Sequence, residues 1–220
     1  MRAHQKVYIS FPEAFWLRPE SEADRVRGFC QWLAPDYAPA TNPHKWNQEM
    51  VELASPGTGA PSHPTLLFYT YGDQSRYLTG EVARIEAEAG AGSEKAKEMT
   101  DAFLYEWFRP YYARLPGYSD ADDDPGCRPC GCQATRWLRD ELAGNGSYSN
   151  FQTGLEAGDA DVEAMRAGAG PDRGLWLAGE HTAPFVALGT ATGAYWSGEH
   201  VAERIARAYC RMKGGVTVVD

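Results

Sequence analysis

The feature that most constrains this sequence is a short apolar segment followed, after a loop, by a helix that begins with small residues. Residues 174–178 are typical of a strand and end at Gly179-Glu180. A Gly-rich stretch at 189–193 then opens a helix that runs to about Met212. The first turn of a helix offers unpaired backbone N–H groups and about half a positive charge. This pattern predicts a binding site at the start of the last helix.

Small residues at this helix start would let a flat ligand lie close to the backbone. The ligand would be a phosphate, a carboxylate, or an aromatic ring that becomes negative when it is reduced. The alternative is a Gly-rich turn that serves only packing, because short Gly motifs are common by chance.

The remaining elements follow from periodicity and from helix and turn signals. We expect strands over 6–11, 65–71 and 133–137, and helices over 79–90, from Ser93 to about Tyr112, and from an Asp159 cap to Arg166. Residues 33–63 read as loop. The second of these helices carries an apolar stripe that we interpret as core packing rather than as a cofactor site: Met99, Phe103, Trp107 and Tyr111.

Composition excludes several classes of protein. The chain has 220 residues, 43% hydrophobic and 23% charged, which indicates one large or two smaller globular domains. No apolar run is long enough to span a membrane, and the first residues lead into a strand pattern rather than a signal segment. The net charge of −9 gives no basic face for nucleic acid. We therefore expect an intracellular, cytoplasmic protein that binds neither nucleic acid nor membrane.

The cysteines cluster at Cys127, Cys130 and Cys132. This spacing suggests a zinc site, but a tetrahedral site needs four ligands and no second Cys or His pair stands at a familiar spacing. We favour a surface loop and expect no metal. The acidic run at 120–125 is likewise interpreted as a solvated loop, because it does not fit the pattern of a calcium-binding loop.

Four ordered blocks of the sequence resemble those of the flavin-containing amine oxidase superfamily, which includes polyamine and monoamine oxidases. The first block is Lys6-Val-Tyr-Ile-Ser-Phe with Phe15-Trp16. The second is Arg136-Trp137 with Asp140 and Gly146-Ser-Tyr-Ser149, and the third is Gly174-Leu-Trp-Leu-Ala-Gly-Glu-His-Thr182. The fourth is Gly189-Thr-Ala-Thr-Gly-Ala-Tyr-Trp-Ser-Gly198 with Ala202-Glu-Arg-Ile-Ala206. The resemblance spans Lys6 to about Ile205.

The resemblance implies an α/β plus α+β fold that corresponds to the C-terminal portion of such an oxidase. Residues 1–130 would form part of a substrate-binding domain with a mixed sheet and helices. Residues 131–220 would form the closing strand and helix of an FAD-binding domain. The G-x-G-x-x-G fingerprint that begins dinucleotide-binding folds is absent from the sequence. Three explanations stay open: a processed subunit with an N-terminal partner chain, a truncated product, or a remnant without activity.

The resemblance also implies roles for particular residues. Lys6 occupies the position of the family's lysine that holds a water against the flavin N5, although an exposed lysine at a frayed terminus is the alternative. Gly179 and Glu180 match residues near the pyrophosphate and ribityl chain of the cofactor. Thr190 and Ala191 match positions whose backbone faces the N1 and O2 edge of the isoalloxazine, where a helix start would stabilise the anionic reduced flavin.

The amine pocket and the flavin wall are assigned in the same way. Tyr148 matches one aromatic wall of the amine pocket, and Phe185 would supply the opposite wall; each could instead be an ordinary core aromatic. Trp137 would pack on the flavin or fill the core. Leu142 stands where the family often has a second aromatic residue. His181 is interpreted as structural, because the family needs no side-chain base.

The activity implied by the resemblance is FAD-dependent oxidation of an amine, with hydride transfer to flavin N5, hydrolysis of the imine and release of hydrogen peroxide. The FAD would be bound non-covalently, and the substrates would be a small-molecule amine and oxygen. One alternative is a non-catalytic remnant or binding module that cannot hold FAD alone. Another is an L-amino-acid oxidase, which would need an arginine for the substrate carboxylate.

Overall fold

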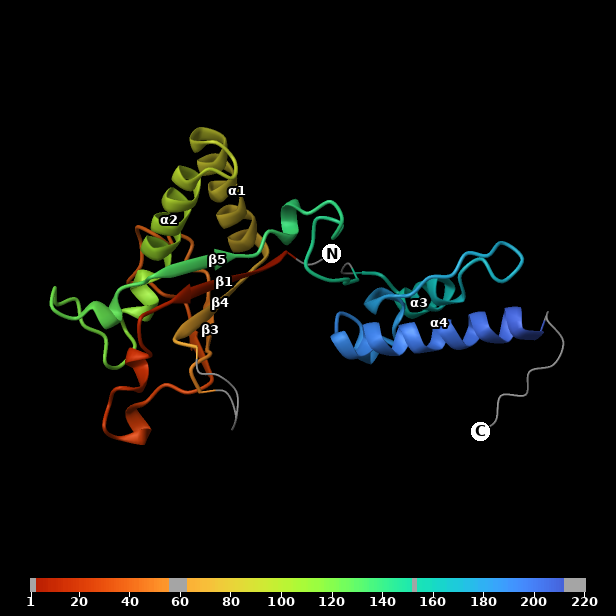
Figure 1. Cartoon of the computed structure of the whole chain (residues 1–220), viewed down its shortest axis with the longest axis horizontal. Helices are drawn as coiled ribbons and strands as arrows, with labels where there is room; N and C mark the ends of the chain where they lie inside the picture. Colours follow the sequence, from red (N-terminus) through yellow and green to blue (C-terminus); the bar gives the residue numbers. More distant parts are fainter. Residues whose placement is uncertain (1–2, 56–62, 152–153, 212–220) are drawn as a thin grey trace. The chain divides into compact units, whose positions relative to one another are not determined.

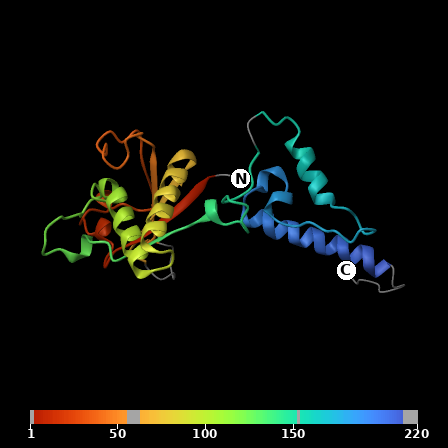
Figure 2. The same cartoon turned by 90° about the horizontal axis from the view of Figure 1, so that it is seen from above.

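The computed structural model describes residues 3–55, 63–151 and 154–211 (Figures 1 and 2). These described residues divide into two compact units, 3–142 and 143–211, which we call the sheet unit and the C-terminal unit. The division falls later in the chain than the expected domain boundary at residue 130. The assignment of the two parts to substrate and cofactor binding stays a prediction.

The sheet unit contains five strands in the order β2-β3-β4-β1-β5 (Figure 1). Their bounds are β1 His4–Ser10, β2 Phe29–Trp32, β3 Gln48–Glu52, β4 Thr65–Tyr71 and β5 Gly131–Ala134. All four pairings are antiparallel, whereas the resemblance implied a mixed sheet. The strands predicted at 6–11 and 65–71 are confirmed, and the one predicted at 133–137 is shorter and begins two residues earlier.

Helices α1 (Gly72–Ala89) and α2 (Glu94–Tyr112) pack on one face of this sheet (Figure 1). The side chains of β1 alternate, so that Val7 and Ile9 are buried with α2 residues such as Phe108 in one hydrophobic core. The predicted stripe of α2 is core packing at Trp107 and Tyr111, which are both buried in that core. The predicted helix start at Ser93 is also confirmed, since its hydroxyl accepts a hydrogen bond from the N–H of Ala96.

The prediction of a loop over 33–63 was wrong, because β3 lies inside that range, and β2 before it was missed. Strand β3 was not predicted because three of its five residues are polar or charged, so the sequence lacks the pattern of a hydrophobic strand. Gln48 is fully buried, and its amide donates to the backbone oxygen of Tyr69 at 2.8 Å and accepts from the side chain of Gln74 at 2.9 Å. Buried polar groups of this kind are stable only when they are hydrogen-bonded, and a hydrophobic pattern cannot reveal them.

The helix predicted over 79–90 begins earlier, at Gly72, which has a positive φ of 52° and follows β4 directly. Gly72-Asp73 therefore forms a tight strand-to-helix junction. Asp73 then lies in the first turn of α1, where a negative charge is favourable to the helix dipole.

The C-terminal unit contains helices α3 (Gly158–Ala167) and α4 (Ala191–Arg211) with two short 3-10 turns, η5 (Glu180–Thr182) and η6 (Phe185–Ala187). The helix predicted from 189 to about 212 is confirmed as α4. Asp159 is not the cap of α3, since the helix begins at Gly158 and Asp159 lies in its first turn.

The strand predicted at 174–178 does not form. The only pairing within this segment, among the described residues, is an isolated bridge between Gly170 and Leu175. A strand is stable only when its N–H and C=O groups pair with a neighbouring strand, and the described part of the C-terminal unit provides none. The prediction of a strand at 174–178 was therefore wrong, because it rested on apolar composition and strand propensity without a partner strand.

The described residues show neither a membrane-spanning helix nor a cluster of metal ligands. No described helix combines the length and the apolar character that crossing a membrane requires. No group of three or more His, Cys, Asp or Glu side chains in the described ranges is arranged to hold a metal ion. Cys127 is instead buried, and its sulfur accepts a hydrogen bond from the N–H of Ser119 at 3.3 Å.

The different environments of the clustered cysteines predict an order of chemical modification. Cys130 is exposed, whereas burial raises the pKa of the Cys132 thiol to about 12. Because the thiolate is the nucleophile, iodoacetamide at mild alkaline pH should label Cys130 first and Cys127 and Cys132 slowly. Mass spectrometry of timed samples measures this order, and the difference should vanish in denaturant. Equal labelling rates in the folded protein would contradict the structure.

Candidate functional site

The start of α4 is open to solvent. The hydroxyl of Thr190 accepts a hydrogen bond from the N–H of Gly193 at 2.9 Å and so caps the helix. Thr190, Ala191 and Thr192 are all exposed. No described residue accepts a hydrogen bond from the N–H groups of Ala191 and Thr192. We call these two N–H groups together with Thr190 the helix mouth; it keeps the donors and the positive end of the helix free for a ligand.

The turn beneath the mouth is tightly packed. Gly193 is buried, and a Cβ atom at this position would collide with the backbone oxygen of Ala187 and lie 2.8 Å from the Cβ of Ala183. Only glycine therefore allows the first turn of α4 to approach η6 so closely. The small residues of the 189–193 stretch thus have a packing role, as the alternative interpretation required, and also leave the outer side of the mouth uncovered.

Glu180 joins the segments around the mouth. One carboxylate oxygen accepts from the N–H of Ser149 at 2.8 Å, and the other accepts from the N–H of Gly189 at 2.6 Å. Hydrogen bonds to a charged acceptor are about twice as strong as neutral ones. The carboxylate therefore holds the Tyr148–Ser149 segment beside the turn that leads into α4.

Gly179 and His181 support the same turn. Gly179 has a φ of 141°, and its N–H donates to the hydroxyl of Ser197 on α4 at 2.7 Å. A Cβ at Gly179 would lie 2.6 Å from the imidazole of His181, so the ring packs directly on this backbone. This contact agrees with the structural interpretation of His181.

An aromatic hollow of about 950 Å³ extends to Leu188, two residues before Thr190, and its walls include Tyr148, Phe151 and Phe185. Tyr148 packs on Gly189, where a Cβ would lie 2.9 Å from its ring. Phe185 is 65% exposed and stacks on Phe151, with ring centroids 5.7 Å apart and planes within 9°. Tyr148 and Phe185 thus line one hollow, and their role as walls of an amine pocket stays a prediction. Phe151 was missed, although it follows Tyr148 by three residues.

Lys6 lies inside β1 rather than at a frayed end. Its N–H donates to the hydroxyl of Thr135 at 2.9 Å, and its backbone oxygen accepts from the N–H of Thr135 at 2.9 Å. Its ammonium lies 5.8 Å from the centre of the Tyr69 ring. Val7 and Ile9 point into the core, so Lys6 lies on the opposite face of β1. The structure therefore fixes the backbone of Lys6 within the sheet.

The predicted residues belong to both units. Lys6 and Trp137 are in the sheet unit, and Gly179, Glu180, Thr190, Ala191, Tyr148 and Phe185 are in the C-terminal unit. Trp137 begins the 3-10 turn η4 (Trp137–Arg139) and is 40% exposed, so it does not fill the core. Leu142, which stands where the family often has a second aromatic residue, is fully exposed.

A comparison with known families gives an independent result. The family model described as flavin containing amine oxidoreductase matches residues 1–206. No curated protein matches the chain well enough for a closer comparison. The match covers both units and every residue of the predicted site, but it tests none of their individual roles.

The packing of α4 predicts opposite effects for two of its glycines. Gly193→Ala should destabilise the chain by about 1–3 kcal/mol, because backbone atoms surround the new methyl group. Gly198→Ala, which has no atom within 4 Å of its new Cβ, should stabilise it by about 0.5–1 kcal/mol. Urea unfolding followed by circular dichroism, with hydrogen exchange in α4, measures both. A Gly193→Ala variant as stable as the wild type would contradict this packing.

Proposed function

The chain belongs to the flavin-containing amine oxidoreductase family, and on this basis we propose that it takes part in FAD-dependent oxidation of a primary or secondary amine. It would act as the C-terminal part of the enzyme. The observation that carries the proposal is the open helix mouth of α4 beside an aromatic hollow. The family match alone supports only a flavin-linked oxidoreductase.

The residues at the mouth fit a flavin. Thr190 and Ala191 are exposed, and the free N–H groups of Ala191 and Thr192 suit the negative edge of a reduced isoalloxazine. A bound FAD would supply the hydride acceptor, and oxygen would later restore it with release of hydrogen peroxide. Because the donors are fixed by the helix, they need no reorganisation when negative charge develops.

The walls of the hollow would orient the substrate. Tyr148 and the Phe151–Phe185 pair offer aromatic faces that would contact an amine in its neutral form. Glu156 and Asp159 also line the hollow, and their carboxylates would attract the cationic form that predominates in solution. The imine that leaves the hollow would be hydrolysed by water.

The lining of the hollow favours an amine over an amino acid. Among the described residues that line it, none is Arg or Lys. An L-amino-acid oxidase would need such a cation to pair with the substrate carboxylate. The two acidic residues of the lining would instead repel that carboxylate. The amino-acid oxidase alternative is therefore not favoured.

The proposal includes a further segment that holds the nucleotide half of FAD, either in the same chain or in an N-terminal partner. The 220 residues contain no G-x-G-x-x-G fingerprint for the pyrophosphate. Helix α4 offers a surface for such a segment, because Tyr195 is 70% exposed and Ala194, Ala202 and Ala206 are exposed on the same helix. Without a segment that holds the nucleotide half of FAD, the chain would be a non-catalytic remnant.

A charge placed at the mouth tests the flavin site. Ala191→Glu should leave stability unchanged or raise it by about 0.3–1 kcal/mol, because a carboxylate favours a helix start. It should nevertheless weaken FAD binding, since it occupies the mouth with negative charge. Ala164→Glu on α3 is the control. FAD is titrated into the full chain, with and without a candidate N-terminal partner, and followed by visible absorbance.

The outcomes of this titration are distinct. Weaker binding by Ala191→Glu alone would support the mouth as the flavin site. Equal binding by both variants would place the flavin elsewhere. No flavin absorbance in the wild type, with or without the partner, would favour the remnant instead.

Replacement of Lys6 tests the family role assigned to it. Lys6→Met should slow reduction or reoxidation of the flavin by about tenfold or more while FAD affinity stays nearly unchanged, because a positioned group near the reacting atoms would be lost. Lys97→Met removes an exposed lysine of the same unit as a control. Stopped-flow absorbance measures both half-reactions. Unaltered rates in both would remove Lys6 from the mechanism.

A further inference from the structure

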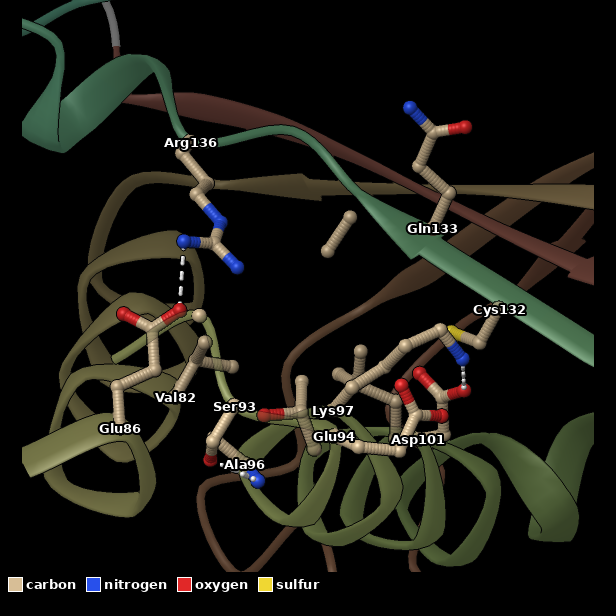
Figure 3. A pocket seen from close by; sticks show the side chains of 14 residues that line it. Val82, Glu86, Ser93, Glu94, Ala96, Lys97, Asp101, Cys132, Gln133 and Arg136 are labelled. Atoms are coloured by element: carbon tan, nitrogen blue, oxygen red, sulfur yellow. Dashed lines mark hydrogen bonds and ion pairs between the residues drawn. The ribbon is translucent and has the colours of Figure 1, made fainter. Parts of the chain in front are cut away.

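The sheet unit contains a cavity of about 390 Å³ between α1, the start of α2 and β5 (Figure 3). Every residue that lines this cavity belongs to the sheet unit. The lining combines apolar side chains with a few charged ones, which is the usual composition of a small-molecule site of this size. None of the lining residues has a role in the proposed amine oxidation, so the cavity is a separate feature of the molecule.

One side of the cavity carries more positive than negative charge. Glu86 of α1 is only 7% exposed, and one of its carboxylate oxygens lies 2.5 Å from the guanidinium of Arg136. The other oxygen lies 3.1 Å from the guanidinium of Arg139. Within the described residues, neither arginine forms an ion pair with a further carboxylate. One carboxylate therefore faces two guanidiniums, and the group of three keeps an excess positive charge.

Arg136 presents this positive charge to the cavity. Figure 3 shows its side chain reaching from the segment after β5 toward Glu86, with the guanidinium beside the cavity. A guanidinium has five N–H donors in a planar fork, and its ion pair with Glu86 does not occupy them all. The fork matches the two oxygens of a carboxylate. Because the buried Glu86 already holds the guanidinium, less side-chain freedom is lost when a second carboxylate binds.

The second ion pair at the cavity is balanced. The ammonium of Lys97 lies 2.8 Å from the carboxylate of Asp101, about one turn further along α2. Figure 3 shows this pair beneath Cys132 and apart from Arg136. Burial raises the pKa of the Cys132 thiol to about 12, so the thiol is neutral near pH 7. Glu94 also lines the cavity, but it is exposed and its charge is screened by solvent. The attraction for an anion is therefore concentrated at Arg136.

Apolar side chains form another part of the lining. Val82 of α1, Leu104 of α2 and Ala134 of β5 contribute to it, one from each element. The same three residues also line a smaller cavity of about 30 Å³, so the apolar surface continues beyond the first cavity. A hydrocarbon chain placed on these residues would be removed from water, which is favourable.

We propose that this cavity binds a small carboxylic acid with an apolar chain, such as a medium-chain fatty acid. The carboxylate pairs with Arg136, which Glu86 holds in place, and the chain lies on Val82, Leu104 and Ala134. The excess positive charge at Arg136 disfavours a cationic ligand of the same length. The site is independent of the proposed oxidation and needs no cofactor.

Three probes with the same apolar chain test the charge preference. Octanoate, octanol and octylamine are each titrated into the full chain by isothermal titration calorimetry. Octanoate should bind about tenfold or more tightly than either of the others, because only its carboxylate can pair with Arg136. A chain that binds no octanoate, or that binds octanol equally well, would overturn the proposal.

Methyl resonances locate the bound chain. In the full chain with ¹³C-labelled Val and Leu methyl groups, octanoate should shift the resonances of Val82 and Leu104, which are assigned with Val82→Ile and Leu104→Met. The resonance of Leu188, which lines the aromatic hollow of the C-terminal unit, should stay in place. Shifts at Leu188 with none at Val82 would assign the acid to the hollow and rule out this site. Larger shifts at Val82 with octylamine than with octanoate would rule out the preference for an acid.

Replacement of Arg136 tests the partner of the carboxylate. Arg136→Gln should weaken octanoate binding about tenfold and leave octanol binding unchanged, because an ion pair is lost and the apolar surface is kept. Glu86 retains Arg139 in this variant, so the fold should persist, as circular dichroism will verify. Arg84→Gln is the matched control, since Arg84 is an exposed arginine of α1 outside the lining and pairs with Glu88. It should alter neither affinity.

Two further variants keep the assignment falsifiable. Arg136→Lys retains the charge without the planar fork, so it should weaken octanoate binding less than Arg136→Gln and serves if that variant does not fold. Lys97→Gln should leave the affinity for octanoate nearly unchanged. A loss in Lys97→Gln as large as in Arg136→Gln would contradict the pairing with Arg136. An equal loss in Arg84→Gln would show a general effect of surface charge and would also defeat the proposal.

Discussion

The candidate site depends on the carboxylate of Glu180. Its two oxygens accept the N–H groups of Ser149 and Gly189, which are forty residues apart in sequence and belong to two different loops. This bridge connects the segment that carries Tyr148 to the turn before α4 through two charge-assisted hydrogen bonds. Tyr148 also packs on Gly189, so one charged group sets both the hollow and the approach to the helix mouth. The site is therefore a product of loop geometry and not of a sheet.

The two units differ in what stabilises them. The hydrophobic core cluster lies wholly in the sheet unit, whereas the buried apolar residues described in the C-terminal unit are Val162 and Ala183. In that unit, side chains such as Arg204 instead donate to the last carbonyls of α3. A unit with so little buried apolar surface is marginal by itself. This deficit is the physical reason to expect that α4 packs against a further segment.

Sequence reasoning succeeded where local chemistry decides the structure and failed where distant residues do. The alternation of β1 and the Ser93 cap are local, and both were predicted. The polar strand β3 depends on Gln48 bonding to Tyr69, which no periodicity reveals. The apolar segment at 174–178 has strand propensity but, among the described residues, no partner strand. The contact of Glu86 with Arg136 and Arg139 joins elements about fifty residues apart, and no pattern in the sequence connects them.

The contrast between local and long-range interactions also explains which features of the helix mouth were predicted. The motif located the residues of the mouth, because glycine spacing is a local signal. It also gave Glu180 a role beside the cofactor, but it did not show what Glu180 binds. Both carboxylate oxygens are already bound to backbone N–H groups, at 2.8 and 2.6 Å, so its charge is partly compensated before any ligand arrives. The donors that remain are the N–H groups of Ala191 and Thr192. A free carboxylate here would compete with an anionic ligand for those donors; a bound one leaves them available.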